Sequence, residues 1–457
     1  MKLRKPTPIQ INAEDPFGDD PLNQQEPIVL LTRLIKSTEQ PFVITIEAPW
    51  GSGKTKFIER WKAHLEKEKQ ACLYFNAWEN DFVSDPLVAF IGELEPLVRK
   101  AEAGDNKKSA VRTGFQKLKE LGGALVKKGA PIFVKSAARK LLGSEGMEEL
   151  AGAISESADD LAEVASKAVE KQIEKYAEEK KGIVSFRETL KQLAEEVTAG
   201  PDKPKQLVFF VDELDRCRPD FAMTLLERIK HLFNVEKVVF VLALDREQLR
   251  NTVRTIYGVG NQADTYLRRF IDLSFKLPKP RDKTFAYNLF TRFRLNEVFA
   301  ERSNGPSEQS RLIDAWAETA SWLNLDLRTQ EQCLTRLNVI ARIWHTAQYM
   351  PTDALSILVG LRVGAPERFE ALRTGKTKIS EQLPIVGISM QKFPQLVEAT
   401  LEIFFGTEED FQITCNAIRK QRGPSNAAYS PREEFLWHLA NHRSELRRLI
   451  EILPSGE

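Results

Sequence analysis

A glycine-bearing turn near residue 50 constrains the fold of this chain more than any other stretch. The turn reads Ala-Pro-Trp-Gly-Ser-Gly-Lys-Thr over residues 48–55. A run of apolar and β-branched residues at 42–46 precedes it, and a helix-prone run at 56–61 follows it. Strand, glycine turn, Gly-Lys-Thr and helix, in this order, are the parts of a P-loop. The sequence therefore predicts an α/β domain that binds nucleotide phosphates at this turn.

The residues of the turn have the chemistry that a phosphate-binding loop requires. Gly51 and Gly53 let the backbone approach phosphate oxygens, so that successive N–H groups and the helix N-terminus point at the anion. We expect Lys54 to reach the β- and γ-phosphates and the Thr55 hydroxyl to help hold Mg²⁺. Position 48 is Ala where the strict pattern has Gly, which is acceptable if that residue needs no positive φ. The predicted nucleotide-binding residues are Trp50, Gly51, Ser52, Gly53, Lys54, Thr55 and Lys56.

A second motif, which is acidic, follows a strand that we expect to be buried. Residues 207–211 are consecutive apolar residues, and they end in Asp212 and Glu213, as in a Walker B strand. A carboxylate at the tip of this strand can bind Mg²⁺ opposite Thr55, so Asp212 and Thr55 are the predicted metal ligands. Glu213 can polarise the attacking water as a general base. The alternative to a Walker B strand is a plain buried strand with an acidic cap. A P-loop upstream makes the Walker B interpretation the better one.

Three further residues are candidates for sensing or stabilising the γ-phosphate. Asp245 follows the strand expected at 237–244, where it is placed like a sensor residue. Arg269, next to Arg268, could act as an arginine finger in its own subunit or a neighbouring one, with a structural salt bridge as the alternative. Arg328 opens a helix in the C-terminal region, and it could sense the γ-phosphate from a lid or lie on a plain helix surface.

The order of the predicted strands indicates the type of α/β fold. Strands are expected at residues 42–46, 71–75, 206–211, 237–244 and 270–275. A strand and its connections intervene between the P-loop strand and the Walker B strand, which is consistent with a three-layer, parallel-sheet P-loop NTPase of the additional-strand class. The predicted parts are the first part of the core (1–102), a charged helical insertion (103–181), the second part of the core with the Walker B strand (182–280) and a helical lid and C-terminal region (281–457).

Composition narrows the setting of the chain. The net charge is +1, so bulk charge indicates neither a nucleic-acid nor a membrane partner. The four cysteines are far apart, as expected in a reducing compartment, and no run approaches the ~20 apolar residues of a membrane span. We therefore expect a soluble, cytoplasmic protein without a membrane span. The basic stretch 117–140 could contact nucleic acid or lipid, or it could be a solvated face or the mate of the acidic stretch after it.

Taken together, these motifs resemble those of the KAP family of P-loop NTPases. The shared pieces are Pro-Phe-Gly-Asp-Asp-Pro-Leu at 16–22, the P-loop at 48–55, Phe-Asn-Ala-Trp at 75–78, Asp-Glu-Leu-Asp-Arg-Cys at 212–217, Leu-Asp-Arg at 244–246 and Tyr-Leu-Arg-Arg at 266–269. Many family members carry transmembrane helices where this chain has its charged insertion, so membrane attachment is not carried over. Family members often have Asp-Asp in place of Asp212-Glu213, which leaves open whether Glu213 or Asp215 is the base.

The resemblance implies ATP hydrolysis that drives a conformational switch or an assembly. Soluble bacterial relatives look like the ATPase components of multi-gene anti-phage defence systems, which implies protein partners and allows a homo-oligomer. ATP and Mg²⁺ are the implied cofactors. The alternative is a nucleotide-gated scaffold with little turnover that recruits protein or DNA.

Overall fold

The computed structural model describes most of the chain. The described residues are 9–102, 108–127, 158–198, 206–258, 262–278, 283–302, 305–345, 350–378, 381, 393–409, 411, 412, 416 and 442–452.

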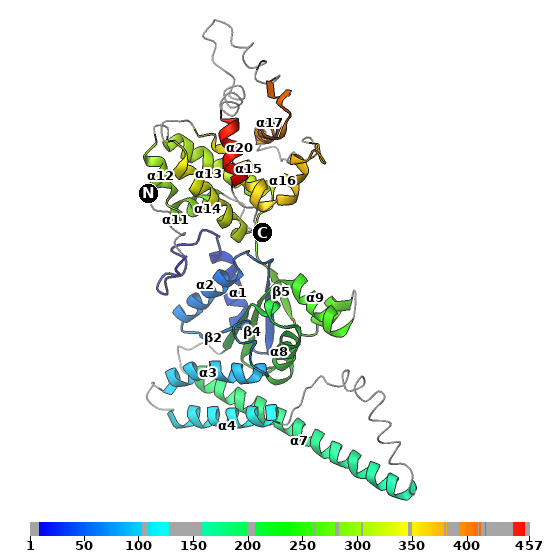
Figure 1. Ribbon diagram of the computed structural model, residues 1–457. Helices are drawn as coiled ribbons and strands as arrows, with labels where there is room; N and C mark the ends of the chain where they lie inside the picture. The colour runs from blue at the N-terminus through cyan, green and yellow to red at the C-terminus, as the bar shows by residue number, and fades with distance from the viewer. Residues whose placement is uncertain are drawn as a thin grey trace.

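A parallel sheet forms the centre of the described chain (Figure 1). Its strands are β1 (Phe42–Glu47), β2 (Ala71–Asn76), β3 (Leu207–Asp212), β4 (Val238–Leu244) and β5 (Leu273–Lys276). They lie side by side in the order β2-β3-β4-β1-β5, and every neighbouring pair is parallel. Because β4 lies between the P-loop strand β1 and the Walker B strand β3, the sheet has the additional-strand arrangement. The predicted fold class is confirmed.

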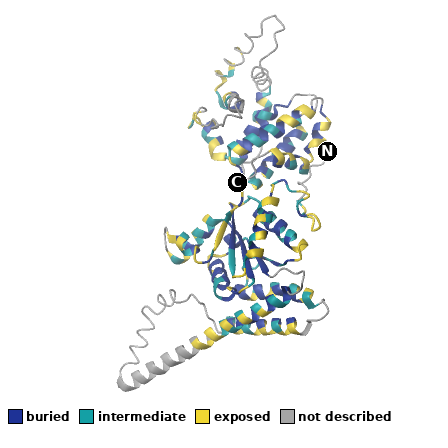
Figure 2. Cartoon of the chain, turned by 180° about the vertical axis from the view of Figure 1, so that it is seen from behind, coloured by how far each residue is buried: buried dark blue, intermediate teal, exposed yellow. Residues whose placement is uncertain are grey.

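Burial along the strands explains why the sequence reads as apolar runs there. All residues of β3 and β4 are buried, as expected for central strands covered on both faces (Figure 2). The edge strand β5 is largely exposed and begins three residues later than predicted. Phe270, which the sequence assigned to this strand, lies instead in a turn where its N–H donates to the carbonyl oxygen of Leu267. It is buried against the helices, so its apolar character reflects packing rather than strand pairing.

One face of the sheet is covered by α1 (Gln25–Ser37) and α2 (Lys54–Lys67). The alternate strand residues Val208 and Phe210 point to this side, where the ring of Trp61 packs edge-on against Phe210 at a centroid distance of 5.4 Å. Since α2 begins at Lys54, this packing also fixes the end of the P-loop.

The opposite face is covered by α3 (Pro86–Glu102), α8 (Pro219–Leu232) and α9 (Arg246–Tyr257). Phe209 and Phe240 of neighbouring strands stack there at 4.9 Å. Phe90 of α3 packs on Phe75 at 4.5 Å and on Phe233 at 5.1 Å. A 3₁₀ turn, η1 (Leu214–Arg216), joins β3 to α8, and α10 (Ala263–Leu267) precedes β5. Helix, sheet and helix are the three predicted layers.

The charged insertion joins this second layer. Its described helices are α4 (Lys108–Lys127) and α7 (Ala158–Thr198), which pack on each other and on α3 (Figure 1). Phe115, Leu118 and Phe186 are buried in the same core as the sheet. Of the basic residues in the predicted arm, Lys117 and Lys119 lie on α4, whereas Lys128, Lys135, Arg139 and Lys140 lie outside the described residues. The predicted boundary after residue 181 falls within α7, and the division into four parts stays a prediction.

After β5 the described elements are helical, and they form a separate core that lies beyond the sheet (Figure 1). They are α11 (Lys283–Arg292), α12 (Leu295–Ala300), α13 (Gly305–Trp322), α14 (Leu327–Ile343), α15 (Thr352–Val359), the π-helical turn η3 (Gly360–Gly364), α16 (Pro366–Arg373), α17 (Phe393–Phe405) and α20 (Arg443–Ile452). None of the helices among the described residues is both long enough and apolar enough to cross a membrane.

Candidate functional site

The P-loop adopts the backbone that its glycines allow. Gly51 has φ +78° and Gly53 has φ +84°, and α2 starts immediately after them at Lys54. Residues other than glycine rarely adopt such φ angles, so the backbone conformation itself requires glycine at both positions. The Nζ of Lys54 donates to the carbonyl oxygens of Ala48 at 2.7 Å and Pro49 at 3.2 Å. Its ammonium group is therefore held inside the curve of the loop, where phosphate oxygens bind in P-loops.

Three carboxylates act on Lys54 from the neighbouring strand ends. Burial lowers the pKa of the Lys54 ammonium, and Asp215, Asp245 and Asp212 oppose that shift by electrostatic attraction. Asp245 also caps α9, since its side chain accepts a hydrogen bond from the Glu247 backbone N–H. The strand ends thus surround the lysine with acids, as expected at the carboxyl edge of a parallel sheet.

Asp212 is fixed at the tip of β3. Its carboxylate is buried and accepts hydrogen bonds from the Glu213 backbone N–H at 2.8 Å, from the Tyr74 hydroxyl at 3.2 Å and from the Thr55 side chain. Burial raises the pKa of this carboxyl, and the hydrogen bonds from Thr55 and Glu213 oppose the shift. The two predicted metal ligands therefore lie in contact. A hydroxyl and one carboxylate are the hard oxygen donors that Mg²⁺ accepts alongside phosphate oxygens and water.

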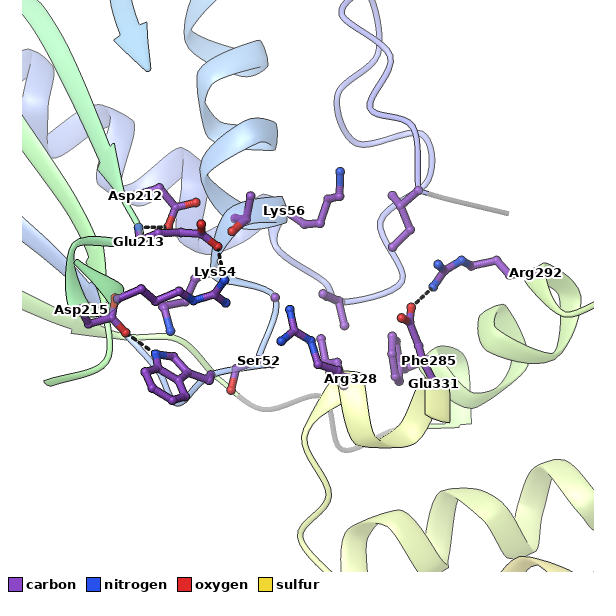
Figure 3. Close-up of a pocket in the computed structure, with 18 residues that line it drawn as sticks. Ser52, Lys54, Lys56, Asp212, Glu213, Asp215, Phe285, Arg292, Arg328 and Glu331 are labelled. Carbon is purple, nitrogen blue, oxygen red and sulfur yellow. Dashed lines mark hydrogen bonds and ion pairs between the residues drawn. The ribbon is translucent and has the colours of Figure 1, made fainter. Parts of the chain in front are cut away.

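The other two acids of the Walker B motif are both engaged. Glu213 has φ +58°, and its Oε1 pairs with Arg216 Nη1 at 2.7 Å, while Asn76 Nδ2 lies 3.5 Å from its Oε2. Asp215 Oδ2 accepts a hydrogen bond of 2.5 Å from Trp50 Nε1 (Figure 3). The second contact links the P-loop directly to the turn after the Walker B strand. Glu213 and Asp215 both stay open as the base.

The C-terminal helices reach the P-loop through the first residues of α14. The Arg328 backbone N–H donates to the carbonyl oxygen of Gly51 at 3.3 Å. Asp326 caps α14 by accepting from the Thr329 backbone N–H at 2.9 Å, and its carboxylate lies directly over Gly51. In Figure 3 the side chain of Arg328 extends from this helix towards the P-loop. The predicted lid helix is thus in contact with the P-loop.

These elements enclose a cavity of about 320 Å³ between the sheet and the C-terminal helices. That volume lies at the lower end of the range of small-molecule sites. The lining residues are Ile9, Leu22, Trp50, Gly51, Ser52, Gly53, Lys54, Thr55, Lys56, Asp212, Glu213, Asp215, Arg216, Phe285, Arg292, Leu327, Arg328 and Glu331. All seven predicted nucleotide-binding residues, both predicted metal ligands, the predicted base and Arg328 are among them.

Two predicted residues do not line the cavity. Asp245 acts on Lys54 through its charge, without lining the cavity. Arg269 lies exposed on the turn after α10, with its guanidinium 5.7 Å from the ring of Tyr266. Its role as an arginine finger, in its own subunit or a neighbouring one, stays a prediction. The roles of all the site residues stay predictions.

Several lining residues were not predicted. The apolar end of the cavity is formed by Leu22 and Ile9 on the N-terminal side and by Phe285 and Leu327 on the helical side. Arg292 of α11 pairs with Glu331 of α14 at 2.8 Å beside them. Leu22 belongs to the motif at 16–22, so that motif was an available signal. The residues from α11 and α14 had no local signal.

A buried arginine explains the motif at 16–22. Arg60 of α2 donates from Nε to the carbonyl oxygen of Pro16 at 2.9 Å and from Nη1 to Gln24 Oε1, and it pairs with Asp20 at 3.2 Å. Asp20 also accepts from the backbone N–H of Gln24 at the start of α1. The motif thus folds the N-terminal segment over α2 and brings Leu22 to the cavity.

Sheet order, P-loop and acidic strand tip together define a P-loop NTPase of the additional-strand class. Residues 28–344 match the family model described as the KAP family P-loop domain, and the chain belongs to that family. The expectation drawn from the sequence motifs is confirmed.

Individual relatives are more distant. An uncharacterized protein of Methanocaldococcus jannaschii is 32% identical over 184 residues, which cover 37% of this chain and 88% of that protein. The phage T7 exclusion protein of Escherichia coli K12 is 24% identical over 119 residues, which cover 26% of this chain and only 15% of that protein. Among solved structures, the ORC2 protein of Aeropyrum pernix in ADPNP and ADP complexes matches with a TM-score of 0.30 and 11% identity, covering 98% of this chain and 96% of that one.

Proposed function

We propose that this chain binds ATP with Mg²⁺ and hydrolyses it as a conformational switch or assembly ATPase. The observation that carries the proposal is the single cavity lined by the P-loop, by Asp212 and Glu213, and by Arg328 of the helical lid. Thr55 and Asp212 would hold Mg²⁺, which supplies positive charge against the phosphates. The apolar lining residues Ile9, Leu22 and Phe285 offer packing for a nucleotide base, and Lys54, Lys56 and Arg328 offer positive charge for the phosphates.

The proposed reaction is in-line attack of water on the γ-phosphate. Lys54 leaves its loop carbonyls for the phosphate oxygens and neutralises charge there. Glu213 orients the water and accepts its proton. Arg328 contacts the γ-phosphate from α14, so that loss of the phosphate loosens the contact between the helical region and the P-loop.

Phosphate release and nucleotide binding test the proposal in matched variants. Lys54→Ala should abolish binding or turnover, and Glu213→Gln should bind ATP but hydrolyse it slowly. Lys62→Ala is the control, because Lys62 lies on the same helix, pairs with Glu66 at 2.8 Å and does not line the cavity. Full turnover by Glu213→Gln would move the base to Asp215. Wild-type turnover by Lys54→Ala would refute the proposed site.

A nucleotide-gated scaffold with little turnover is the second candidate. The ion pair between Glu213 and Arg216 favours it, because a paired carboxylate is not ready to accept a proton. Phosphate release near zero in every condition, with and without DNA or partner protein, would support the scaffold over the ATPase.

We further propose that the chain works in the cytoplasm with partner proteins in a multi-gene anti-phage defence system. Similarity to the phage T7 exclusion protein over part of the chain supports this setting. Phage plating on cells that carry the gene with its neighbours tests it: Lys54→Ala should lose protection. Equal protection by wild type and variant would count against a nucleotide-dependent defence role. We also propose that the stretch 117–140 binds DNA and that the chain associates with itself. Both can be measured on the purified protein.

A further inference from the structure

Arg216 occupies a position that the predicted reaction does not use. It ends the 3₁₀ turn after the Walker B strand, and its side chain lines the cavity beside Lys54 and Arg328. Its Nη1 pairs with Glu213 Oε1 at 2.7 Å, and its guanidinium carbon lies 5.5 Å from the ring of Trp78. The predicted base thus shares its carboxylate with a cation that faces the same space as the phosphates would.

The pair between Arg216 and Glu213 is exchangeable. The side chains of Arg216 and Glu213 are 25% and 17% exposed, and ion pairs that water reaches contribute little to stability. Lys54, Arg216 and Arg328 line the same cavity. A nucleoside triphosphate brings several negative charges into this cluster of cations, whereas Glu213 supplies one. An entering γ-phosphate is therefore the stronger partner for the guanidinium, which binds phosphate oxygens in a bidentate manner.

We propose that Arg216 is a catalytic residue that exchanges Glu213 for the γ-phosphate when a nucleoside triphosphate binds. The exchange frees the Glu213 carboxylate to take the proton of the attacking water. The water oxygen forms a bond to the γ-phosphorus, the bond from that phosphorus to the β–γ bridging oxygen breaks, and the products are nucleoside diphosphate and phosphate. The guanidinium stabilises charge on the phosphoryl group as it transfers. This inference rests on the proposed function and adds a residue to it.

Arg216→Gln and Arg216→Lys test the exchange, with Arg218→Gln as the matched control. Arg218 lies two residues further on, binds the Asp81 carbonyl oxygen at 2.6 Å and does not line the cavity. Three quantities are measured on the full chain: kcat for phosphate release, affinity for a non-hydrolysable ATP analogue and affinity for ADP. Thermal unfolding verifies that each variant is folded.

Arg216→Gln should lower kcat about 100-fold or more, the range of a lost transition-state contact. The variant should bind the ATP analogue about 10-fold more weakly and keep its affinity for ADP, because only the triphosphate has the γ-phosphate. Arg216→Lys should recover part of kcat, and Arg218→Gln should match wild type throughout.

Equal loss of analogue and ADP affinity in Arg216→Gln would overturn the γ-phosphate contact. A rise of kcat in that variant would also overturn the proposal, since Arg216 would then only restrain Glu213. A wild type that binds the analogue but releases no phosphate would refute the proposed ATPase, and with it the catalytic role. A wild type that hydrolyses ATP no faster than Arg216→Gln would refute the role of Arg216 alone.

Discussion

Gly51 stands where the P-loop meets the lid helix α14, and its replacement by alanine probes that contact. Its φ of +78° is in the left-handed region, which costs an L residue about 1–2 kcal/mol. A Cβ on Gly51 would lie 2.4 Å from Asp326 Oδ1 and 3.1 Å from Arg328 Cβ. The Asp326 carboxylate is held in place, since it accepts from the Thr329 N–H at 2.9 Å and the Thr329 hydroxyl at 2.8 Å.

The magnitude follows from these contacts. To make room, Asp326 must give up its capping hydrogen bonds, which contribute about 1 kcal/mol. Gly51→Ala should therefore lower the free energy of unfolding by about 2–3 kcal/mol, of which about 1–2 is backbone strain. Asp326→Ala alone should cost about 1 kcal/mol. In the double variant the clash is absent, so its free energy of unfolding should fall by about 2–3 kcal/mol. This loss is about 1 kcal/mol smaller than the sum of the losses in the two single variants, and that difference is the coupling energy.

Urea denaturation of the four nucleotide-free proteins measures this cycle. Gly258→Ala is the control, because Gly258 has φ +63° and nothing within 4 Å of an added Cβ. It should cost only backbone strain and should add to Asp326→Ala without coupling. If Gly51→Ala and Asp326→Ala also add to within about 0.5 kcal/mol, the lid helix does not rest on the P-loop.

Three further predictions concern single side chains. Burial raises the pKa of the Glu227 carboxyl from 4.5 to about 7. The folded chain therefore keeps this proton to higher pH than the unfolded chain does. As the pH rises from 4.5 to 7, the free energy of unfolding should fall by about 3 kcal/mol. Urea denaturation at pH 4 and pH 8 checks this: the free energy of unfolding of Glu227→Gln, relative to wild type, should be about 3 kcal/mol higher at pH 8 than at pH 4. The same difference between variant and wild type at both pH values would contradict the prediction. Arg60→Met leaves Asp20 without its buried cation and should cost about 3 kcal/mol or more, with weaker ATP binding; unchanged thermal unfolding would refute the anchoring role. Trp50→Phe removes the hydrogen bond to Asp215 and should cost about 1 kcal/mol, because the indole is 45% exposed and water partly replaces it; no loss would exclude this link as stabilising.

The sequence predicted best those parts of the molecule whose signal is local. The P-loop and the Walker B motif each combine a strand, a turn and a charged group within one short stretch, residues 42–55 and 207–216, so the sheet and the P-loop side of the cavity could be predicted. The edge strand was predicted too early, because Phe270 is apolar for a packing reason that a strand pattern imitates.

The helical side of the cavity could not be derived in the same way. Phe285, Arg292 and Glu331 reach the cavity only because α11 and α14 pack against the sheet domain, and nothing in their local sequence distinguishes them from other helix residues. The pairing of Glu213 with Arg216 could not be predicted either, since charged side chains three residues apart in a turn can point in many directions. Contacts between distant segments decide these features.

Helix α7 is 41 residues long, and its C-terminal end packs in the core beside the sheet. Phe186 is buried there, and Arg187 Nε donates to the His231 carbonyl oxygen of α8 at 2.9 Å. The other end extends well past the sheet (Figure 1). At 1.5 Å per residue, about 44 Å of helix separates Arg187 from Ala158, so a tilt of about 5° at the root would swing the tip by about 4 Å. Because α8 directly follows the Walker B turn and contacts the root of α7, a small shift of that turn would become a displacement of several ångströms at the far end of α7.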